Sequence, residues 1–469
     1  MSAKDRRGFI KTVAAGVAGL AIGGIGGFLA SSMNQQPTTT ARTETRTVTL
    51  RETITQTVTG AASPRTTPTT PLKVGVINPL SGGGAPLGDP GAKGGLLAVE
   101  LINQAGGILG RRIEVVGPID TVGLPDRAVD AVTRLVQQEG CRIIIGEVTS
   151  AAGLAIADAA DRLGFLWMPC EVWTPRVFET RRKFTFRLSW SDAAAGVGAA
   201  LMALRIKPDV RTIATINQDY AHGRDNWESF RSTIQALKPD VRVVEELWFP
   251  LYGLTDATPF ITRLMAARPD IVQSTIWGSD RFVFYRQAVP AGYFRTVLHL
   301  DTCLTGMDGH NRETWPDGLY AGSQYNRFYP PWDLWPINKE FNEAFIRRFG
   351  QPAFAEGAQS AANMFTNFLA LKQAIEKAAA TVGGWPEIDE VAQAMVGMRV
   401  IGPKGIITIR EDHEFEGPQV WARTKYVSGV PYPIVDPNEV VTFPAELTVP
   451  PPGVAWREWV RNYKIRAIT

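Results

Sequence analysis

The sequence predicts an α/β fold with two doubly wound parallel sheets. Short apolar runs with the length of buried strands alternate with longer segments whose apolar residues recur at helical spacing. This alternation occurs twice, once over 73–168 and again over 211–300. Strict alternation of strand and helix is typical of a parallel sheet covered by helices, so two series predict two such sheets.

The first series opens with a strand at 74–77 and a loop at 78–88 that is rich in Gly and Pro. A helix follows and stops at Gly106 and Gly107. A strand end that leads into a helix is where open α/β sheets bind small ligands, so we expect this loop to border a binding site. Its glycines either bring the backbone close to a ligand or simply form turns. The later elements of the series are a strand at 112–116, a helix at 126–139, a strand at 141–145, a helix at 150–163 and a strand at 165–168.

The second series is expected to contain strands at 211–216, 241–247, 271–275 and 297–300, with helices at 225–237, 258–267 and 280–288. A long helix at 355–379 and strands at 405–409 and 419–425 come afterwards. These late elements are too few for a third full domain. We interpret them as returns of the chain to the two sheets.

The composition is that of a globular protein, since 45% of the 469 residues are apolar and 20% are charged. Residues 1–71 hold eight of the 49 Lys and Arg residues but only three of the 46 acids, which leaves 41 basic and 43 acidic residues in the remainder. The remainder is therefore close to neutral and lacks the basic surface of a nucleic-acid-binding protein.

The N-terminal segment, 1–35, places Arg6 and Arg7 before Gly-Phe-Ile-Lys and a weakly hydrophobic run at 12–32. This pattern resembles a twin-arginine export signal, and the alternative is a transmembrane anchor with basic flanks. No Cys precedes Cys141, which excludes lipoprotein anchoring, and no clear cleavage site is visible. We expect an extracytoplasmic protein, periplasmic or at the cell surface, that meets the membrane only through this leader and is tethered by it if the leader stays uncleaved.

Residues 36–71 are dominated by Thr, as in the segment TTPTTP, and cannot bury enough apolar surface to fold. We interpret them as an extended, disordered stalk that is either a passive linker or a carrier of O-glycans.

From 72 to about 429 the chain resembles the type I periplasmic solute-binding proteins of the branched-chain amino acid and amide class, which serve ABC transporters. The matching segments are, in order, VGVINPLSG, IIGEVTSAAGLAIADAADRLGFLWMP, FTFRLSWSD, INQDYAHGRDNWESF, TDATPFITRLMAARPDIV, AEGAQSAANMFTNFLALKQAIEKA and ITIREDHEFEGPQVWA. The resemblance implies a first lobe from 72–190 with 326–397, a second lobe from 191–325 with 398–430, and a C-terminal extension at 431–469. It also implies that the lobes, joined by a hinge, close on a ligand in the cleft between them.

The implied function is capture of a small amino-acid-like or amide ligand, or a related polar solute, and its delivery to the permease subunits of an ABC transporter. We expect a monomeric binding domain that uses no cofactor and no metal. The same clamp also serves sensor ectodomains, but no signalling domain follows the lobes in this sequence. An enzyme is disfavoured because the four His residues lack metal-ligand spacing and no G-x-S-x-G or C-x-x-C motif occurs.

The resemblance places Ser150 where a hydroxyl and a backbone N–H receive a ligand carboxylate. With Thr149 it stands at a predicted helix N-terminus, which favours anions, although either residue could instead merely cap the helix. In the loop after the next strand, Glu171 and Trp173 stand where the family usually has small residues and hydroxyls. They predict a ligand with a cationic or NH-rich part and a flat or apolar body. The alternative for Trp173 is packing between the lobes.

Tyr220 and Trp277 match aromatic positions on the family's second lobe, where they either stack on the ligand or fill a gap between the lobes. Asp301 follows the strand at 297–300 and is the candidate to receive a ligand ammonium or amide N–H. Glu147 and Glu171 are the alternatives for that role.

Overall fold

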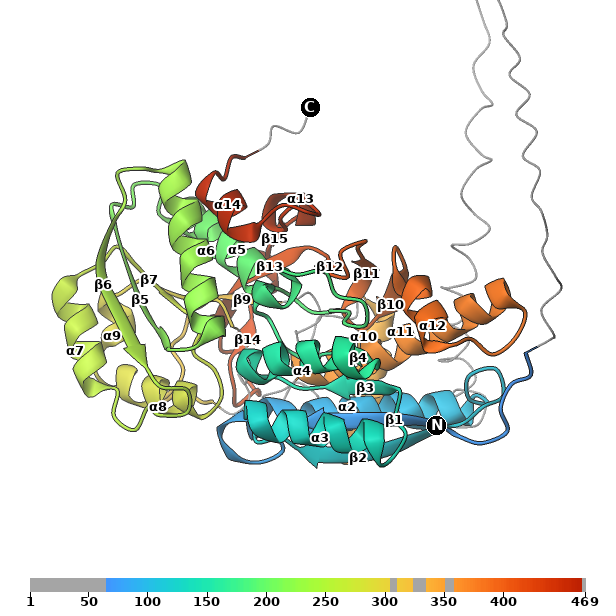
Figure 1. Ribbon diagram of the computed structural model, residues 1–469. Helices are drawn as coiled ribbons and strands as arrows, with labels where there is room; N and C mark the ends of the chain where they lie inside the picture. The colour runs from blue at the N-terminus through green and yellow to red at the C-terminus, as the bar shows by residue number, and fades with distance from the viewer. Residues whose placement is uncertain (1–64, 304–309, 324–334, 351–357, 466–469) are drawn as a thin grey trace, which may run out of the picture.

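The computed structural model describes residues 65–303, 310–323, 335–350 and 358–465. They form two lobes that lie side by side, each built around one of the predicted parallel sheets, which confirms the predicted fold class (Figure 1). The predicted leader at 1–35 and most of the predicted stalk at 36–71 lie outside these residues. Within the described part of the chain, no helix has the length and apolar character needed to cross a membrane.

The first lobe has a four-stranded parallel sheet in the order β2-β1-β3-β4. Its strands are β1 (Leu72–Asn78), β2 (Ile113–Asp120), β3 (Ile143–Gly146) and β4 (Leu166–Met168). The segments that follow these strands contain η1 (Gly82–Gly84), α2 (Ala85–Gln104), α3 (Pro125–Gln137), α4 (Ser150–Leu163) and η2 (Pro175–Phe178). Alternate strand residues are buried in separate apolar clusters, one under α2 and one under α3 and α4, because helices cover both faces of the sheet.

The second lobe continues the same design in a larger sheet, along which β14-β13-β9-β8-β7-β5-β6 are neighbours. The parallel strands are β5 (Thr212–Gln218), β6 (Arg242–Phe249), β7 (Ile271–Ser274), β8 (His299–Asp301) and β9 (Tyr320–Ser323). The antiparallel edge is formed by β13 (Gln419–Lys425), β14 (Ile434–Val435) and β15 (Val441–Phe443). The helices are α5 (Asp192–Ile206), α6 (Ala221–Leu237), α7 (Thr258–Ala267), α8 (Ser279–Ala288) and α9 (Tyr293–Thr296).

After β9 the chain returns to the first lobe and adds helices to it, before β13 joins the sheet of the second lobe. Three helices, α10 (Pro336–Phe349), α11 (Ala358–Val382) and α12 (Ile388–Met395), pack with the first lobe. A small antiparallel sheet follows, consisting of β10 (Arg399–Gly402), β11 (Gly405–Ile409) and β12 (Phe415–Glu416). Its apolar side chains pack in the first-lobe cluster. The sequence placed all of 398–430 in the second lobe, whereas only β13 joins that lobe's sheet.

The Gly-rich segment predicted as a loop at 78–88 becomes helical earlier than expected, since α2 begins at Ala85. Pro86 is tolerated in the first turn, where a backbone N–H would have no intrahelical acceptor. Farther along the helix, a Cβ on Gly94 would collide with the carbonyl group of Ala361 in α11. Some of the glycines therefore permit close helix packing rather than a long loop.

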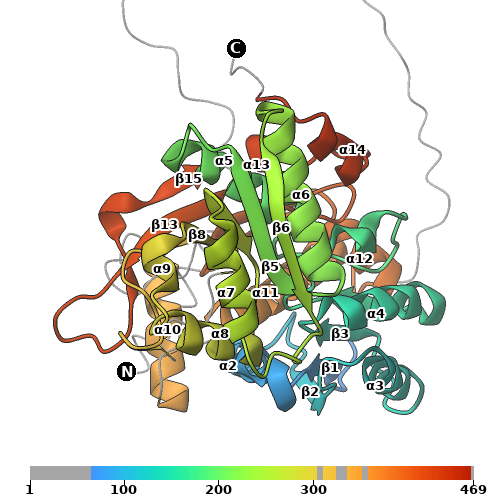
Figure 2. The same ribbon diagram turned by 90° about the vertical axis from the view of Figure 1, so that its left-hand side faces the viewer.

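The C-terminal extension adds η5 (Pro437–Glu439), α13 (Ala445–Thr448) and α14 (Trp456–Arg461). Trp456 and Val460 pack in a cluster with α5, and α14 lies beside α6 (Figure 2). The extension also reaches the first lobe, where Glu179 accepts hydrogen bonds from the Trp456 indole N–H and from Arg457. It thus contacts both lobes.

Candidate functional site

The first wall of the interlobe site is the turn from β3 into α4. Glu147 occupies the left-handed backbone region, with φ 82°. Its buried carboxylate accepts hydrogen bonds from the backbone N–H groups of Val148 and Thr149, each at 2.9 Å, and from the Thr121 hydroxyl at 2.7 Å. Burial raises the pKa of Glu147, although these donors oppose the shift. Glu147, an alternative candidate for a ligand cation, is thus hydrogen-bonded within its own turn.

Ser150 is the first residue of α4 and is buried. Neither of the two candidate hydroxyls caps this helix: Thr149, at the N-cap, makes no side-chain capping bond, and its hydroxyl donates to the Gly123 carbonyl. The Ser150 hydroxyl accepts a 3.3 Å bond from the Thr174 N–H, so its own hydrogen can still be donated. Because the first-turn N–H groups of a helix have no intrahelical acceptors, this end of α4 can receive an anion.

The loop after β4 brings Glu171 and Trp173 together. The Trp173 indole N–H donates to the Glu171 carboxylate at 2.8 Å, and Gln359 and Ser360, at the start of α11, donate to the same carboxylate at 2.7 and 3.1 Å. Both predicted site residues are buried. Glu171 therefore fixes the orientation of the indole ring and ties the loop to α11.

The second lobe contributes an aromatic wall at the carboxyl ends of β5 and β7. The Trp277 indole N–H donates to the Tyr220 hydroxyl at 2.7 Å. Across the lobe boundary, the Trp173 ring lies 5.4 Å from the His222 ring, which lies 5.7 Å from the Tyr220 ring. The structure therefore places two predicted aromatic residues, Trp173 and Tyr220, beside a histidine, and the third, Trp277, against Tyr220.

His222 was missed by the sequence reasoning, although it follows Tyr220 by only two residues. Burial alone would lower the pKa of His222, but the Asp192 carboxylate, 2.7 Å from Nδ1, outweighs it and raises the pKa to about 10. The ring is thus an imidazolium at neutral pH. Asp192 begins α5, thirty residues earlier in the chain, so no local sequence motif could predict that it pairs with His222.

The structure places Asp301 in a second group of side chains behind this wall. Its buried carboxylate lies 3.0 Å from Arg281 and accepts hydrogen bonds from the Tyr285 hydroxyl at 2.6 Å and the Cys303 N–H at 2.8 Å. Asp301 therefore already has three donors.

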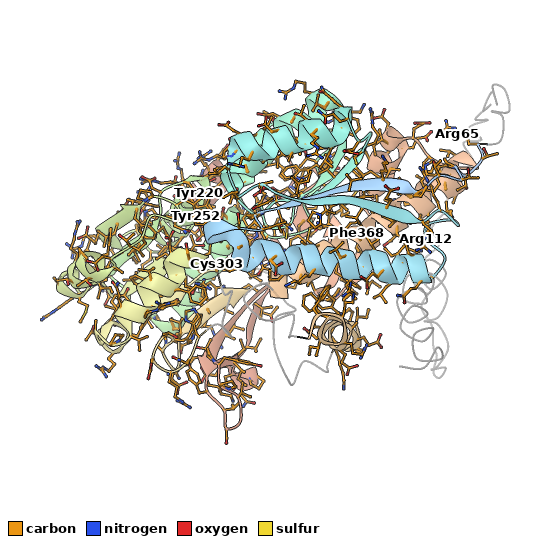
Figure 3. The ribbon with its side chains drawn as sticks, turned by 90° about the horizontal axis from the view of Figure 1, so that it is seen from below. Arg65, Arg112, Tyr220, Tyr252, Cys303 and Phe368 are labelled. Carbon is orange, nitrogen blue, oxygen red and sulfur yellow. The ribbon has the colours of Figure 1, made fainter. Side chains whose placement is uncertain are left out.

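Two further contacts join the lobes. On one side, Asp225 in α6 accepts hydrogen bonds from the Thr174 hydroxyl at 2.7 Å and from Arg176 at 2.6 Å. On the other, Tyr252, from the loop after β6, lies so close to the first lobe's Gly83 that a Cβ added there would be 2.5 Å from its Cγ; within the second lobe its ring packs against Trp277 with centroids 5.5 Å apart. Figure 3 shows Tyr220, Tyr252 and Cys303 where the lobes meet. Tyr252 was also missed, since no motif surrounds it.

Among the described residues, no group of three or more His, Cys, Asp or Glu side chains could hold a metal ion. The site consists of a helix N-terminus on one lobe, an aromatic wall on the other and an imidazolium between them. Such an arrangement can bind a small anion with a flat body. It defines a two-lobed binding protein.

The comparison with known families agrees with this class. The chain belongs to the periplasmic binding protein family, whose model matches residues 71–426. This is a family of binding proteins rather than enzymes, as the sequence predicted. The predicted C-terminal extension, 431–469, lies beyond the matched residues.

Two curated relatives show the level of similarity. The chain is 28% identical over 251 residues to the Leu/Ile/Val-binding protein BraC3 of Rhizobium johnstonii, covering 53% of this chain and 65% of the relative. It is 28% identical over 239 residues to the leucine-, isoleucine-, valine-, threonine- and alanine-binding protein of Pseudomonas aeruginosa, covering 51% and 60%. The chain thus matches less than two thirds of the length of either relative.

Solved structures share the fold. A solute-binding protein of an ABC transporter from Rhodopseudomonas palustris BisB5, in complex with 3,4-dihydroxybenzoic acid, superposes with a TM-score of 0.69 at 23% identity, covering 80% of this chain and 97% of that one. The leucine-binding protein LivK of Thermotoga maritima superposes with a TM-score of 0.62 at 23% identity, covering 79% and 97%.

Proposed function

We propose that the protein captures a small carboxylate solute with a flat or apolar body between its lobes, outside the cytoplasm, and delivers it to the permease of an ABC transporter. The observation that carries the proposal is the contact between the lobes where Trp173 lies against His222 beside Tyr220. The Trp173 loop is also joined to the α4 N-terminus, because the Thr174 N–H donates to the Ser150 hydroxyl. The family and the names of its members support capture and delivery of a solute.

The carboxylate end of the solute is assigned to the first lobe. The Ser150 hydroxyl and the first-turn N–H groups of α4 supply donors, and the helix dipole adds a favourable field. On the opposite lobe, His222 is already paired with Asp192 through Nδ1 and with Thr275 through Nε2, so the donors are those of the first lobe. Since a charge-assisted hydrogen bond is stronger than a neutral one, these donors favour an ionised carboxylate over an amide.

The body of the solute is assigned to the aromatic rings. Trp173, Tyr220 and Trp277 offer flat faces on both lobes. The three acids considered for a ligand ammonium, Glu147, Glu171 and Asp301, all accept hydrogen bonds from protein groups. This favours an aromatic acid over an amino acid within the amino-acid-like and amide solutes that the sequence suggested. The 3,4-dihydroxybenzoic acid complex of the R. palustris relative is consistent with that preference.

The transport role also concerns how the protein is exported and how it meets the membrane. We infer a monomeric clamp that is exported through a twin-arginine-type leader and meets the membrane through that leader alone, with the Thr-rich stalk as a spacer. Lobe closure on the solute would present both lobes to the permease.

The experiment is to purify the full chain, identify any co-purifying solute by mass spectrometry, and titrate benzoate, 4-hydroxybenzoate, L-leucine and L-phenylalanine by calorimetry. We expect one aromatic acid to bind tightly, and Trp277→Ala to weaken it about tenfold. Trp385→Ala, which alters a first-lobe tryptophan beside Arg111, is the matched control. Failure of the wild-type chain to bind any carboxylate would contradict the proposal.

A further inference from the structure

Tyr252 reaches from the second lobe into the glycine turn that opens the first. A Cβ added to Gly83 would lie 2.5 Å from Tyr252 Cγ and 2.7 Å from Ser279 Oγ, and one added to Gly84 would lie 2.7 Å from the Tyr252 hydroxyl. The turn therefore accepts the tyrosine ring only because these positions lack side chains. We call the surface formed by Gly83 and Gly84 the glycine socket.

A glycine of the second lobe likewise allows the backbone of the first lobe to come close. Gly278, which precedes α8 in the second lobe, would with a Cβ come 2.5 Å from the Gly83 carbonyl oxygen. The two lobes thus meet backbone to backbone beside the Tyr252 ring. The nearest atoms to a Cβ on Gly83 belong to the second lobe, so this glycine serves the contact between lobes rather than the packing of its own lobe.

Tyr252 is held in an unusual conformation. Its φ of 58° lies in the left-handed region, which is costly for a residue other than glycine. The carboxylate of Asp280 accepts its backbone N–H at 2.7 Å and keeps the loop in place. Strain of this kind, maintained by a dedicated partner, points to a role for the side chain itself.

The Tyr252 hydroxyl is buried and has no hydrogen-bond partner within the described part of the chain. It lies beside the α4 turn: a Cβ on Gly123 would be 3.2 Å from this hydroxyl and 2.7 Å from Thr149 Cγ2. Burial, together with the nearby carboxylates of Glu147 and Asp280, raises the pKa of Tyr252, so the group stays a protonated donor. An unpaired buried donor beside an anion-binding helix end has a ready acceptor in a bound carboxylate.

We propose that Tyr252 is a specificity-determining residue that closes over the bound solute by entering the glycine socket and donates its hydroxyl to the solute carboxylate. This inference rests on the proposed function. The two lobes can then close fully only when the Tyr252 ring fits against Gly83 and Gly84. A solute that is too large to let the lobes close there would prevent the ring from entering the glycine socket and would not receive the hydrogen bond from the Tyr252 hydroxyl.

The test is a double-mutant cycle on the full chain, with calorimetric affinities for benzoate, 4-hydroxybenzoate, L-leucine and L-phenylalanine. Tyr252→Phe keeps the ring, and we expect it to weaken the tightest of these probes about tenfold. Gly83→Ala should weaken the same probe at least tenfold, because the new methyl group occupies the place of the ring. In the Tyr252→Ala background, Gly83→Ala should cause a much smaller loss, because only the Ser279 hydroxyl then remains close to the new methyl group.

The matched control is Tyr320→Phe, in β9 of the same lobe, which should leave the affinity within twofold of wild type. Equal losses from Gly83→Ala in both backgrounds, or wild-type affinity in Tyr252→Phe, would overturn the role of Tyr252 while leaving the proposed function intact. A wild-type chain that binds none of the four probes would instead contradict the proposed function. Thermal melting of each variant shows whether an altered affinity reflects misfolding.

Discussion

Replacement of Ser150 by Ala separates a binding role from a structural one. In the folded protein the Ser150 hydroxyl accepts one long hydrogen bond, 3.3 Å, from the Thr174 N–H. The substitution leaves that buried N–H without its acceptor, which costs about 1 kcal/mol of unfolding free energy. No helix cap is lost, because neither Ser150 nor Thr149 makes a capping bond.

The effect on binding should be larger than the effect on stability. A hydrogen bond from the Ser150 hydroxyl to a carboxylate is worth about 1.5–3 kcal/mol, so Ser150→Ala should raise Kd by roughly 10- to 150-fold. The assay is calorimetric titration of the solute that co-purifies with the wild-type chain, beside urea unfolding of both proteins.

Ser229→Ala is the matched control. Its hydroxyl donates a buried 2.7 Å bond to the Ala193 carbonyl within the second lobe, away from the α4 turn. This variant should lose similar stability and keep wild-type affinity. If Ser150→Ala lost only stability and bound the solute like wild type, the assignment of the carboxylate to the α4 N-terminus would be refuted.

Three further substitutions test other parts of the structure. Arg187→Ala leaves the partly buried Glu414 carboxylate and two buried carbonyl groups without their donor, so urea unfolding should show a loss of about 3 kcal/mol; the more peripheral Arg182→Ala is its comparison. Arg457→Ala removes the ion pair between the C-terminal extension and Glu179 of the first lobe but keeps the Trp456 hydrogen bond to the same carboxylate; since the ion pair is partly exposed, unfolding at low salt should show a loss below about 1 kcal/mol that vanishes in 1 M NaCl. Asp192 raises the pKa of His222 above its ordinary value of 6.5, so the stabilisation is complete below about pH 6.5 and is lost as pH rises toward 10. In His222→Gln, the unfolding free energy measured from pH 6 to 10 should lack that decline, and an unchanged decline would exclude the histidine as its source.

Local patterns predicted the elements well where periodicity and end signals agreed. The helices at 150–163 and 258–267 have the predicted bounds, and α4 ends at Gly164 with a φ of 68°. The strands at 405–409 and 419–425 also agree. The start of α2 was missed because glycine and proline normally break helices, whereas here they fit a first turn and a close helix contact.

The site was only partly accessible from the sequence. The family resemblance pointed to Ser150, Tyr220 and Trp277, which the fold places at the α4 N-terminus and after the carboxyl ends of β5 and β7, although their part in binding stays a prediction. His222 and Tyr252 acquire their surroundings only when the lobes meet, through Asp192 and through the glycine socket. Such contacts join elements distant in the chain and leave no local pattern.

The most direct test of the account is an experimental structure of the protein with its co-purified solute. We expect the carboxylate within hydrogen-bond distance of Ser150 and the body of the solute against Tyr220 and Trp277, with the lobes closed. A solute bound outside the interlobe region, or between the lobes without contact to Ser150, would contradict the account.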